Sequence, residues 1–275
     1  MEIVLFVSKK ISFQIICSFA VIFELSHFQI LTLIHTTKGI VIRTVKYGET
    51  SVIVSIFTEL FGIQSYLVNG ARTSGKSTKA HFFQPSSLLE MQVYHNELKN
   101  LQRIKDLKWS SLYKNIFSEV TKNAIALYMV ELLQKCLKQP ETNEELFHFC
   151  EDAFLQLDIS TNSVTANFPI YFAVHLAQML GFRLLDNYSE ERNIFNLQEG
   201  IFSEEQSASP HHVNKEISHH IAELLRALQP QDLEGIKLNR RTRFSILKIL
   251  ENYYLWHVPE FGKMKTLNVL SEIMG

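Results

Sequence analysis

The sequence predicts an α+β protein in which a small five-stranded β-barrel is followed by an α-helical region. Between residues 39 and 105, short runs rich in β-branched residues alternate with tight turns, which is typical of a closed barrel or sandwich. From residue 113 onward, apolar residues recur three or four positions apart, which is the period of a helix. We therefore expect a barrel domain over residues 33–110 and a helical domain over residues 111–275.

The composition fits a globular protein of about two domains. The chain has 275 residues, of which 46% are hydrophobic and 20% charged, and this proportion supports a sizeable core. Three cysteines stand far apart with no C-x-x-C pair, so neither a disulfide framework nor a cysteine metal site is indicated. A reducing cytoplasm is the compartment that this cysteine usage favours.

Residues 1–32 are treated separately from both domains. Lys9 and Lys10 precede an apolar run over residues 11–23, which has about the length of a signal peptide and is too short to span a bilayer comfortably. No cleavage signature of small residues follows, because Glu24 and His27 come next. We interpret the segment as an extension outside the working domains. A membrane or export signal, or a packed strand or helix, remains an alternative.

Five segments carry the strand pattern, with turns at residues 46–49 and 60–62 and a hairpin around residues 95–97. The expected strands are residues 39–45, 51–57, 63–68, 88–94 and 98–105.

Six helices are expected after the barrel. The first begins at residue 113 and ends before Pro140, and the third ends at Gly181, since proline and glycine stop helices. The others are expected over residues 143–157, 213–228, 240–256 and 264–273, and the third begins at residue 168. Residues 186–213 are polar, acidic and rich in turn formers, so we expect an irregular connector there.

Charge is distributed unevenly although the net charge is −1. Residues 33–110 hold ten Lys and Arg against five Asp and Glu, and residues 235–275 hold seven against three. Residues 139–234 hold four against sixteen. Positive charge is thus collected at the two ends of the chain, around an acidic middle, and would attract a polyanion there.

The loop over residues 68–79 has two incompatible interpretations. Residues 70–77 match the pattern of a phosphate-binding loop, which would make the chain a nucleotide-binding enzyme using Lys76 and Ser77. That site needs a long helix directly after the loop, whereas Pro85 stops the segment after too few residues. The pattern therefore favours a flexible cationic loop on a barrel.

A cationic barrel surface predicts nucleic-acid binding through phosphate contacts. The candidate DNA-binding residues are Arg43, Lys46, Arg72, Lys76, Lys79, Arg103 and Lys105. Tyr47, Phe82, Phe83 and Tyr94 are candidates for base stacking, although most aromatic side chains of a small barrel belong to its core.

Metal and catalytic sites receive little support. His212, Glu216 and His220 share one face of an expected helix but would need a further ligand from elsewhere, and a solvated helix face is the simpler interpretation. No nucleophile elbow or other hydrolase arrangement is present.

Three arginines begin one of the expected helices. Arg240, Arg241 and Arg243 oppose the dipole of this helix. Either the acidic middle of the chain or an external phosphate backbone would compensate for them.

A series of short motifs resembles the bacterial recombination-repair protein family RecO. In order, they are residues 39–43, 47–51, 57–58, Gly62, residues 70–72, 76–77 and 84–85. Weaker matches follow at residues 127–133, 180–182 and 253–257. The resemblance covers the chain from about residue 33 onward.

The resemblance implies an N-terminal OB-fold and a helical domain without enzymatic activity or cofactor. It further implies a cytoplasmic, nucleoid-associated protein that binds single- and double-stranded DNA, anneals complementary strands and, with RecR, helps load RecA. The family also binds the acidic, apolar C-terminal tail of single-stranded-DNA-binding protein. For that tail we expect Leu132, Leu133 and Lys135 to form the site.

One departure from the family concerns zinc. Many members hold zinc through four cysteines in the connector, whereas residues 186–213 contain none, so no metal site is expected. We therefore predict a DNA-binding recombination mediator. The alternatives are a phosphate-loop enzyme and a membrane-tethered adaptor that retains residues 11–23.

Overall fold

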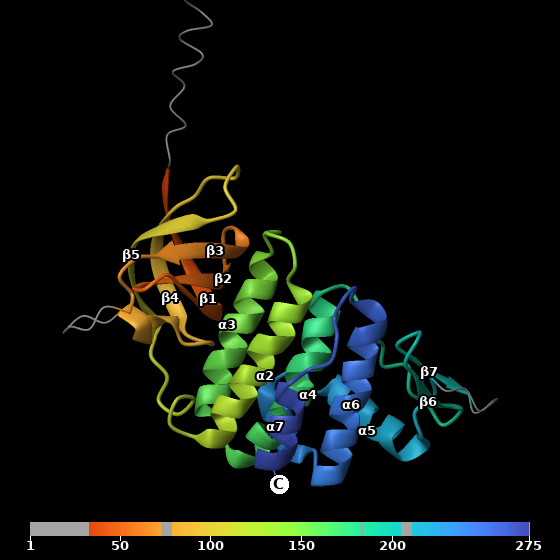
Figure 1. Ribbon diagram of the computed structural model, residues 1–275. Coiled ribbons are helices and arrows are strands. Elements are labelled where there is room, and N and C mark those ends of the chain that lie inside the picture. The colour runs from red at the N-terminus through yellow and green to blue at the C-terminus, as the bar shows by residue number, and fades with distance from the viewer. Residues whose placement is uncertain (1–32, 73–78, 183, 205–210, 275) are drawn as a thin grey trace, which may run out of the picture.

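The computed structural model describes residues 33–72, 79–182, 184–204 and 211–274. A β-barrel and a helical region lie side by side, and a small β-hairpin lies at the end of the helical region far from the barrel (Figure 1). Residues 1–32, including the apolar run over residues 11–23, lie outside the described part.

The barrel closes in the strand order β1-β2-β3-β5-β4. Its strands are β1 (Ile34–Tyr47), β2 (Ser51–Thr58), β3 (Gly62–Val68), β4 (Leu88–Tyr94) and β5 (Gln102–Ser111). All neighbours are antiparallel except β3 and β5, which are parallel. A short 3₁₀ helix, η1 (Lys79–Phe83), lies between β3 and β4. This arrangement is that of an OB-fold, so the predicted fold class is confirmed.

The barrel interior is filled by alternate residues of each strand, as the pleat requires. Val52, Val54 and Ile56 of β2 point inward, together with Tyr66 and Val68 of β3. The side chains between them therefore point outward.

The helical region contains α2 (Val120–Cys136), α3 (Glu144–Ile159), α4 (Asn162–Met179), α5 (Lys215–Arg226), α6 (Arg240–His257), α7 (Thr266–Ile273) and the 3₁₀ helix η2 (Pro230–Gly235). Asparagine caps three of them: the side chains of Asn143, Asn214 and Asn239 accept hydrogen bonds from amides in the first turns of α3, α5 and α6. Helix α4 packs against α2, α6 and η2 and is buried on most of its sides.

Helix α2 begins at Val120, later than predicted, because the residues before it are held in a turn. The buried carboxylate of Asp158 accepts hydrogen bonds from the amides of Lys114, Asn115 and Ile116, each at 2.8 Å. These bonds satisfy the backbone without a helix.

Two further element boundaries differ from the prediction. Helix α4 starts six positions before residue 168 and contains Pro169 in its interior. The apolar residues on either side of the proline are fully buried, so packing outweighs the local cost of proline. Strand β5 begins at Gln102, because residues 95–101 form a loop.

The prediction of an irregular connector over residues 186–213 was wrong in one respect. The described part contains an antiparallel hairpin, β6 (Arg192–Asn196) and β7 (Ile201–Glu204). Phe195 and Phe202 are buried, with their ring centroids 5.1 Å apart. The Ser218 hydroxyl on α5 accepts a hydrogen bond from the Phe195 amide and donates one to the Val213 carbonyl. Aromatic packing and this hydroxyl hold the connector.

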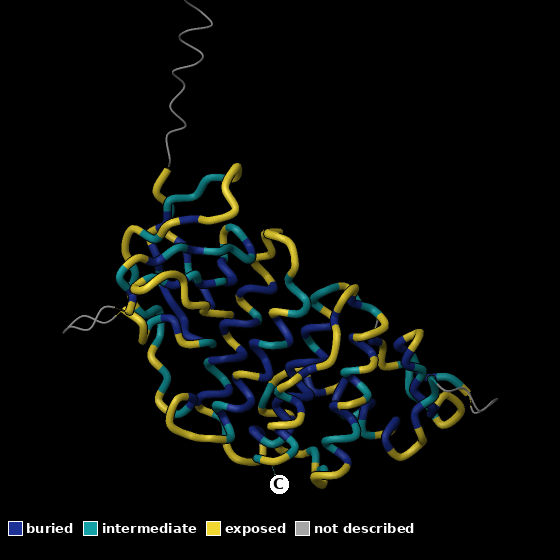
Figure 2. The backbone as a smooth tube through the Cα atoms, viewed as in Figure 1, coloured by how far each residue is buried: buried dark blue, intermediate teal, exposed yellow. Residues whose placement is uncertain are grey.

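Barrel and helices share one apolar core. Ile40, Phe57 and Leu88 of the barrel are buried in the same cluster as α2, α3 and α4, and the Phe57 and Phe147 rings are 5.5 Å apart. Buried backbone runs continuously from the strands into the neighbouring helices (Figure 2). The barrel and the helical region are therefore joined by a shared apolar core.

Among the described residues, no helix is long and apolar enough to cross a membrane. The same residues contain no group of three or more His, Cys, Asp or Glu side chains arranged to hold a metal ion. His220 Nδ1 instead lies 2.8 Å from Glu223 Oε2.

Candidate nucleic-acid interface

The outer face of β1, β2 and β3 is covered at one end and open at the other. At the covered end, Ile40, Phe57 and Ile63 pack against the helical region. At the open end, Val45, Ile53 and Leu67 are aligned by strand pairing. Residues that are directly opposite in a sheet share a face, so these three form one apolar row. We call the open part of this face the outer barrel face. The sequence indicates this outer apolar face, because the same strands carry apolar residues on both of their faces.

A β-bulge places Arg43 on the outer barrel face. Val41 pairs with inward-pointing Ile56, whereas Arg43 pairs with outward-pointing Ser55, because the register shifts between them. Bulges commonly redirect a side chain in this way. Without the bulge, Arg43 would point into the barrel.

Two more predicted cations lie on or beside this face. Arg103 on β5 pairs with Leu67 and therefore lies at the β5 end of the apolar row. The Arg72 amide donates to the Thr50 carbonyl at 2.9 Å, which holds Arg72 at the open end of the β1–β2 hairpin. Arg43, Arg72 and Arg103 are all exposed.

The remaining predicted cations are placed differently. Lys46 lies on the side of β1 that faces η1, because Thr44 on that side donates to the Phe83 carbonyl at 2.7 Å. Lys79 begins η1 itself, and Lys105 occupies the bulge of β5. Lys76 lies outside the described residues. The structure therefore separates one arginine group from lysines around other parts of the barrel.

These cations have no acidic partners within the described residues. Six of the predicted cations lie within the described residues and form no ion pair there: Arg43, Lys46, Arg72, Lys79, Arg103 and Lys105. By contrast, Lys108 pairs with Glu90 at 3.0 Å and Lys38 with Glu151 at 2.8 Å. The unpaired cations are the ones available to phosphate groups.

The four proposed stacking residues differ in exposure, and one of them is buried. Tyr47 is 53% exposed at the open end of the outer barrel face, and Tyr94 shares the face with Arg103. Phe83 is buried in the barrel core, and Phe82 packs on Trp109 with centroids 4.8 Å apart. The prediction for Phe83 was therefore wrong, because its ring lies in the core. Phe82 is half-buried, as Tyr94 is, so its role in stacking stays a prediction.

The phosphate-loop interpretation is not supported. Residues 73–78 lie outside the described part, but the segment after them is a 3₁₀ helix of five residues. Strand β3 is antiparallel to β2 within a closed barrel. A nucleotide site of that type needs a parallel sheet and a helix that begins at the loop.

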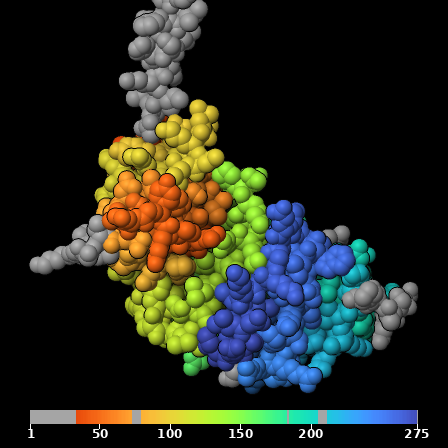
Figure 3. Space-filling view, in the orientation of Figure 1, coloured from red at the N-terminus to blue at the C-terminus, as the bar shows by residue number. Residues whose placement is uncertain are grey.

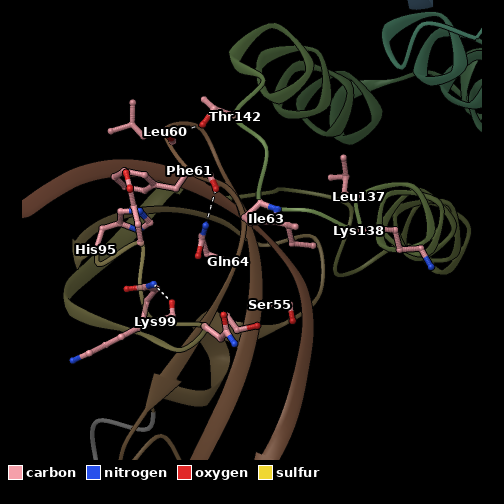
Figure 4. A pocket seen from close by; sticks show the side chains of 15 residues that line it. Ser55, Leu60, Phe61, Ile63, Gln64, His95, Lys99, Leu137, Lys138 and Thr142 are labelled. Atoms are coloured by element: carbon pink, nitrogen blue, oxygen red, sulfur yellow. Dashed lines mark hydrogen bonds between the residues drawn. The ribbon is translucent and has the colours of Figure 1, made fainter.

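The loop over residues 95–101 separates two clefts on the barrel surface. One, of about 660 Å³, lies between the barrel and the α2–α3 connection (Figure 4). The other, of about 540 Å³, is lined by Leu67, Tyr94 and Arg103. Neither cleft was predicted, because each is formed by segments distant in the sequence.

The residues expected to bind a partner's tail are structural. Leu132 and Leu133 are fully buried in the core, so this placement corrects the prediction that they line a surface pocket. Lys135 Nζ donates to the Phe261 carbonyl at 2.7 Å and lies 5.3 Å from the centre of the Phe261 ring. It ties α2 to the segment before α7.

A different, shallow apolar pocket lies between α6 and α7, with a volume of only about 20 Å³. Arg240, Arg243, Phe244, Leu247, Leu270, Ser271 and Met274 line it. A guanidinium nitrogen of Arg240 donates to the Ser271 carbonyl, and burial lowers the pKa of Arg243. Residues that the sequence marked only as a cationic helix start thus border an apolar pocket.

Comparison with known proteins places both regions in one family. The model of the recombination protein O N-terminal domain matches residues 32–113, and that of the C-terminal domain matches residues 118–267. A DNA repair protein RecO of Flavobacterium psychrophilum is 35% identical over 87% of this chain and 98% of its own length. The RecO proteins of Christiangramia forsetii and Bacteroides fragilis are 34% and 31% identical, each over 88% of this chain and at least 99% of their own lengths.

Proposed function

Because the chain belongs to the RecO family of DNA repair proteins, we propose that it is a recombination mediator that binds single-stranded DNA on the outer barrel face. In this proposal it acts by binding and not by catalysis. It anneals complementary strands and, together with RecR, helps load the recombinase onto single-stranded DNA.

The observation that carries this proposal is the group of unpaired arginines beside an accessible aromatic ring. Arg43, Arg72 and Arg103 border the apolar row of the outer barrel face, and Tyr47 lies at its open end. Cations that follow the phosphates and rings that stack on bases are what sequence-independent binding of a single strand requires. A strand held by its phosphates keeps base edges accessible, as annealing demands.

A salt titration tests the proposal. Fluorescence anisotropy of labelled single-stranded DNA should show affinity that falls steeply as salt rises. Arg43→Ala and Arg103→Ala should each weaken binding and reduce the slope of log affinity against log salt by about one. Lys108→Ala, which removes a cation already paired with Glu90, is the matched control and should change the slope less. A wild-type protein that fails to bind at low salt would refute the proposal.

We also propose that the pocket between α6 and α7 receives the acidic, apolar C-terminal tail of single-stranded-DNA-binding protein. Apolar side chains there are bordered by Arg240 and Arg243, so a terminal carboxylate and an apolar end group would both find partners. In the space-filling view, the blue α6–α7 surface and the orange β-hairpin of the barrel face the same side, with α2 and α3 between them (Figure 3). A partner's tail and its DNA would thus be within reach together.

Binding of a synthetic tail peptide tests this site. Arg243→Ala should weaken binding roughly tenfold, because it removes one charged hydrogen-bond donor. Arg241→Ala, which alters an exposed arginine that does not line the pocket, should leave the affinity within about twofold. Equal effects of the two variants would show that only general charge attracts the peptide.

A further inference from the structure

We propose that the cleft between the barrel and the α2–α3 connection holds one unstacked nucleobase of a bound DNA strand. This inference rests on the proposed function and extends it by naming a site for a base, whereas the arginines explain only the contacts with phosphates. The cleft's volume of about 660 Å³ is within the usual range for small-molecule sites. We call it the base cleft.

One wall of the base cleft is a preformed aromatic pair. The Phe61 and His95 rings are stacked, with centroids 3.8 Å apart and planes inclined by 11°. His35 packs edge-on against Phe61 at 5.1 Å. Burial and the neighbouring His35 lower the pKa of His95, which favours a neutral ring at pH 7. A neutral aromatic surface is suited to stacking on a base.

The rest of the base cleft is polar. Ser55 and Ser65 form its floor, since they are paired on β2 and β3 and line the cleft. Gln64 lies in the middle of the close-up view, and its amide donates to the Phe61 carbonyl at 2.8 Å (Figure 4). The Nδ1 atom of His95 is buried without a hydrogen-bond partner among the described residues. Hydroxyl and amide groups beside a stacking wall match the mixed donors and acceptors of a base edge.

The base cleft lies next to the path of the strand. Its floor residue Ser55 is the pairing partner of Arg43, so a phosphate held by Arg43 would be at the rim. Two lysines, Lys99 and Lys138, also line the cleft. The Lys138 Nζ points away from the cleft, towards the Glu260 carbonyl 3.5 Å away (Figure 4). In this arrangement the base cleft would hold the base, and Arg43 would bind the phosphate backbone of the same DNA strand.

The helical region keeps the base cleft open and rigid. Pro140 and Thr142 form its far side, and the Thr142 hydroxyl donates to the Leu60 carbonyl at 3.1 Å. Because this side is fixed to the barrel, little conformational entropy is lost when a base enters.

The test measures how much of the DNA affinity depends on bases. The full chain is titrated with a short oligothymidylate and with an abasic strand of the same length at one salt concentration. The wild-type protein should prefer the strand with bases. In Phe61→Leu and in Ser65→Phe, which fills the base cleft from its floor, this preference should shrink roughly tenfold. Phe117→Leu changes an exposed aromatic residue of the helical region and should keep the preference.

The outcomes separate this inference from the proposed function. If wild-type protein binds neither strand at low salt, both fail. If it binds both strands with normal salt dependence but all variants keep the wild-type preference, only the base cleft is refuted. A further arm titrates deoxyadenosine monophosphate by calorimetry. Binding of this nucleotide that Ser65→Phe abolishes, with an unchanged preference between the strands, would overturn the inference in favour of a free-nucleotide site.

Discussion

Gly62 is the residue on which the junction between barrel and helical region depends. It has φ of +61°, and a Cβ atom there would lie 2.2 Å from the carbonyl oxygen of Glu141. The preceding turn is fixed by the Thr58 hydroxyl, which donates to the Gly62 carbonyl at 2.8 Å. This close approach lets the α2–α3 connection lie against the barrel and form the far side of the base cleft.

We expect Gly62→Ala to destabilise the protein more than Gly48→Ala. Both glycines have positive φ, but the space around Gly48 is open. Gly48→Ala should therefore lower the free energy of unfolding by about 1 to 2 kcal/mol from backbone strain alone. Gly62→Ala adds a clash with backbone and should cost about 1 to 3 kcal/mol more. Urea denaturation of both variants measures the difference, and equal losses would contradict the close contact.

At the scale of elements, the loop over residues 95–101 is organised by one buried side chain. The Gln102 amide accepts a hydrogen bond from the Asn96 amide at 3.0 Å and donates to the carbonyls of Asn96 and Lys99 at 2.9 and 2.6 Å. A loop without strand pairing thus has a fixed shape. Both clefts of the barrel surface depend on it, because it forms one side of each.

Gln102→Ala should loosen this loop. It leaves backbone groups without partners, which should lower the free energy of unfolding by about 1 to 3 kcal/mol. Amide hydrogen exchange of residues 95–101 should become faster, since local opening costs less. The control is Gln92→Ala, on an exposed position of neighbouring β4, which should leave exchange in the loop unchanged. Slow exchange in the Gln102 variant would mean that other contacts shape the loop.

At the scale of the whole molecule, the charge distribution should orient a DNA strand that binds as proposed. The barrel segment is basic, whereas residues 139–234 carry sixteen acidic against four basic residues. The β6–β7 hairpin and α5 belong to this acidic segment and lie at the end away from the barrel (Figure 1). A polyanion should therefore be attracted to the barrel and repelled from the far end.

Hydrogen exchange with and without single-stranded DNA should reveal this orientation. Protection is expected in β1 from residue 43 to 47, in β3 and in the loop over residues 95–101. The hairpin β6–β7 and α5 should exchange equally with and without DNA, and they serve as internal controls. Protection confined to the helical region would place the DNA elsewhere and contradict the outer barrel face.

The two-part architecture, the approximate strands and helices, and the presence of a cationic barrel could all be predicted from the sequence alone. Alternation, helical period and turn residues are local properties, so they can be recognised without the fold. Family motifs were also legible, because they are short and ordered along the chain. The absence of cysteines in residues 186–213 was equally evident, but the hairpin that occupies this segment was not.

Which side chains meet could be seen only once the elements were packed together. A single bulge turned Arg43 outward, and helix packing buried Leu132 and Leu133, which an apolar pattern cannot distinguish from a pocket. Phe61 and His95, which are distant in the sequence, are stacked on each other in the fold. Strand register and packing between elements are non-local, and they alone determine which face a residue occupies.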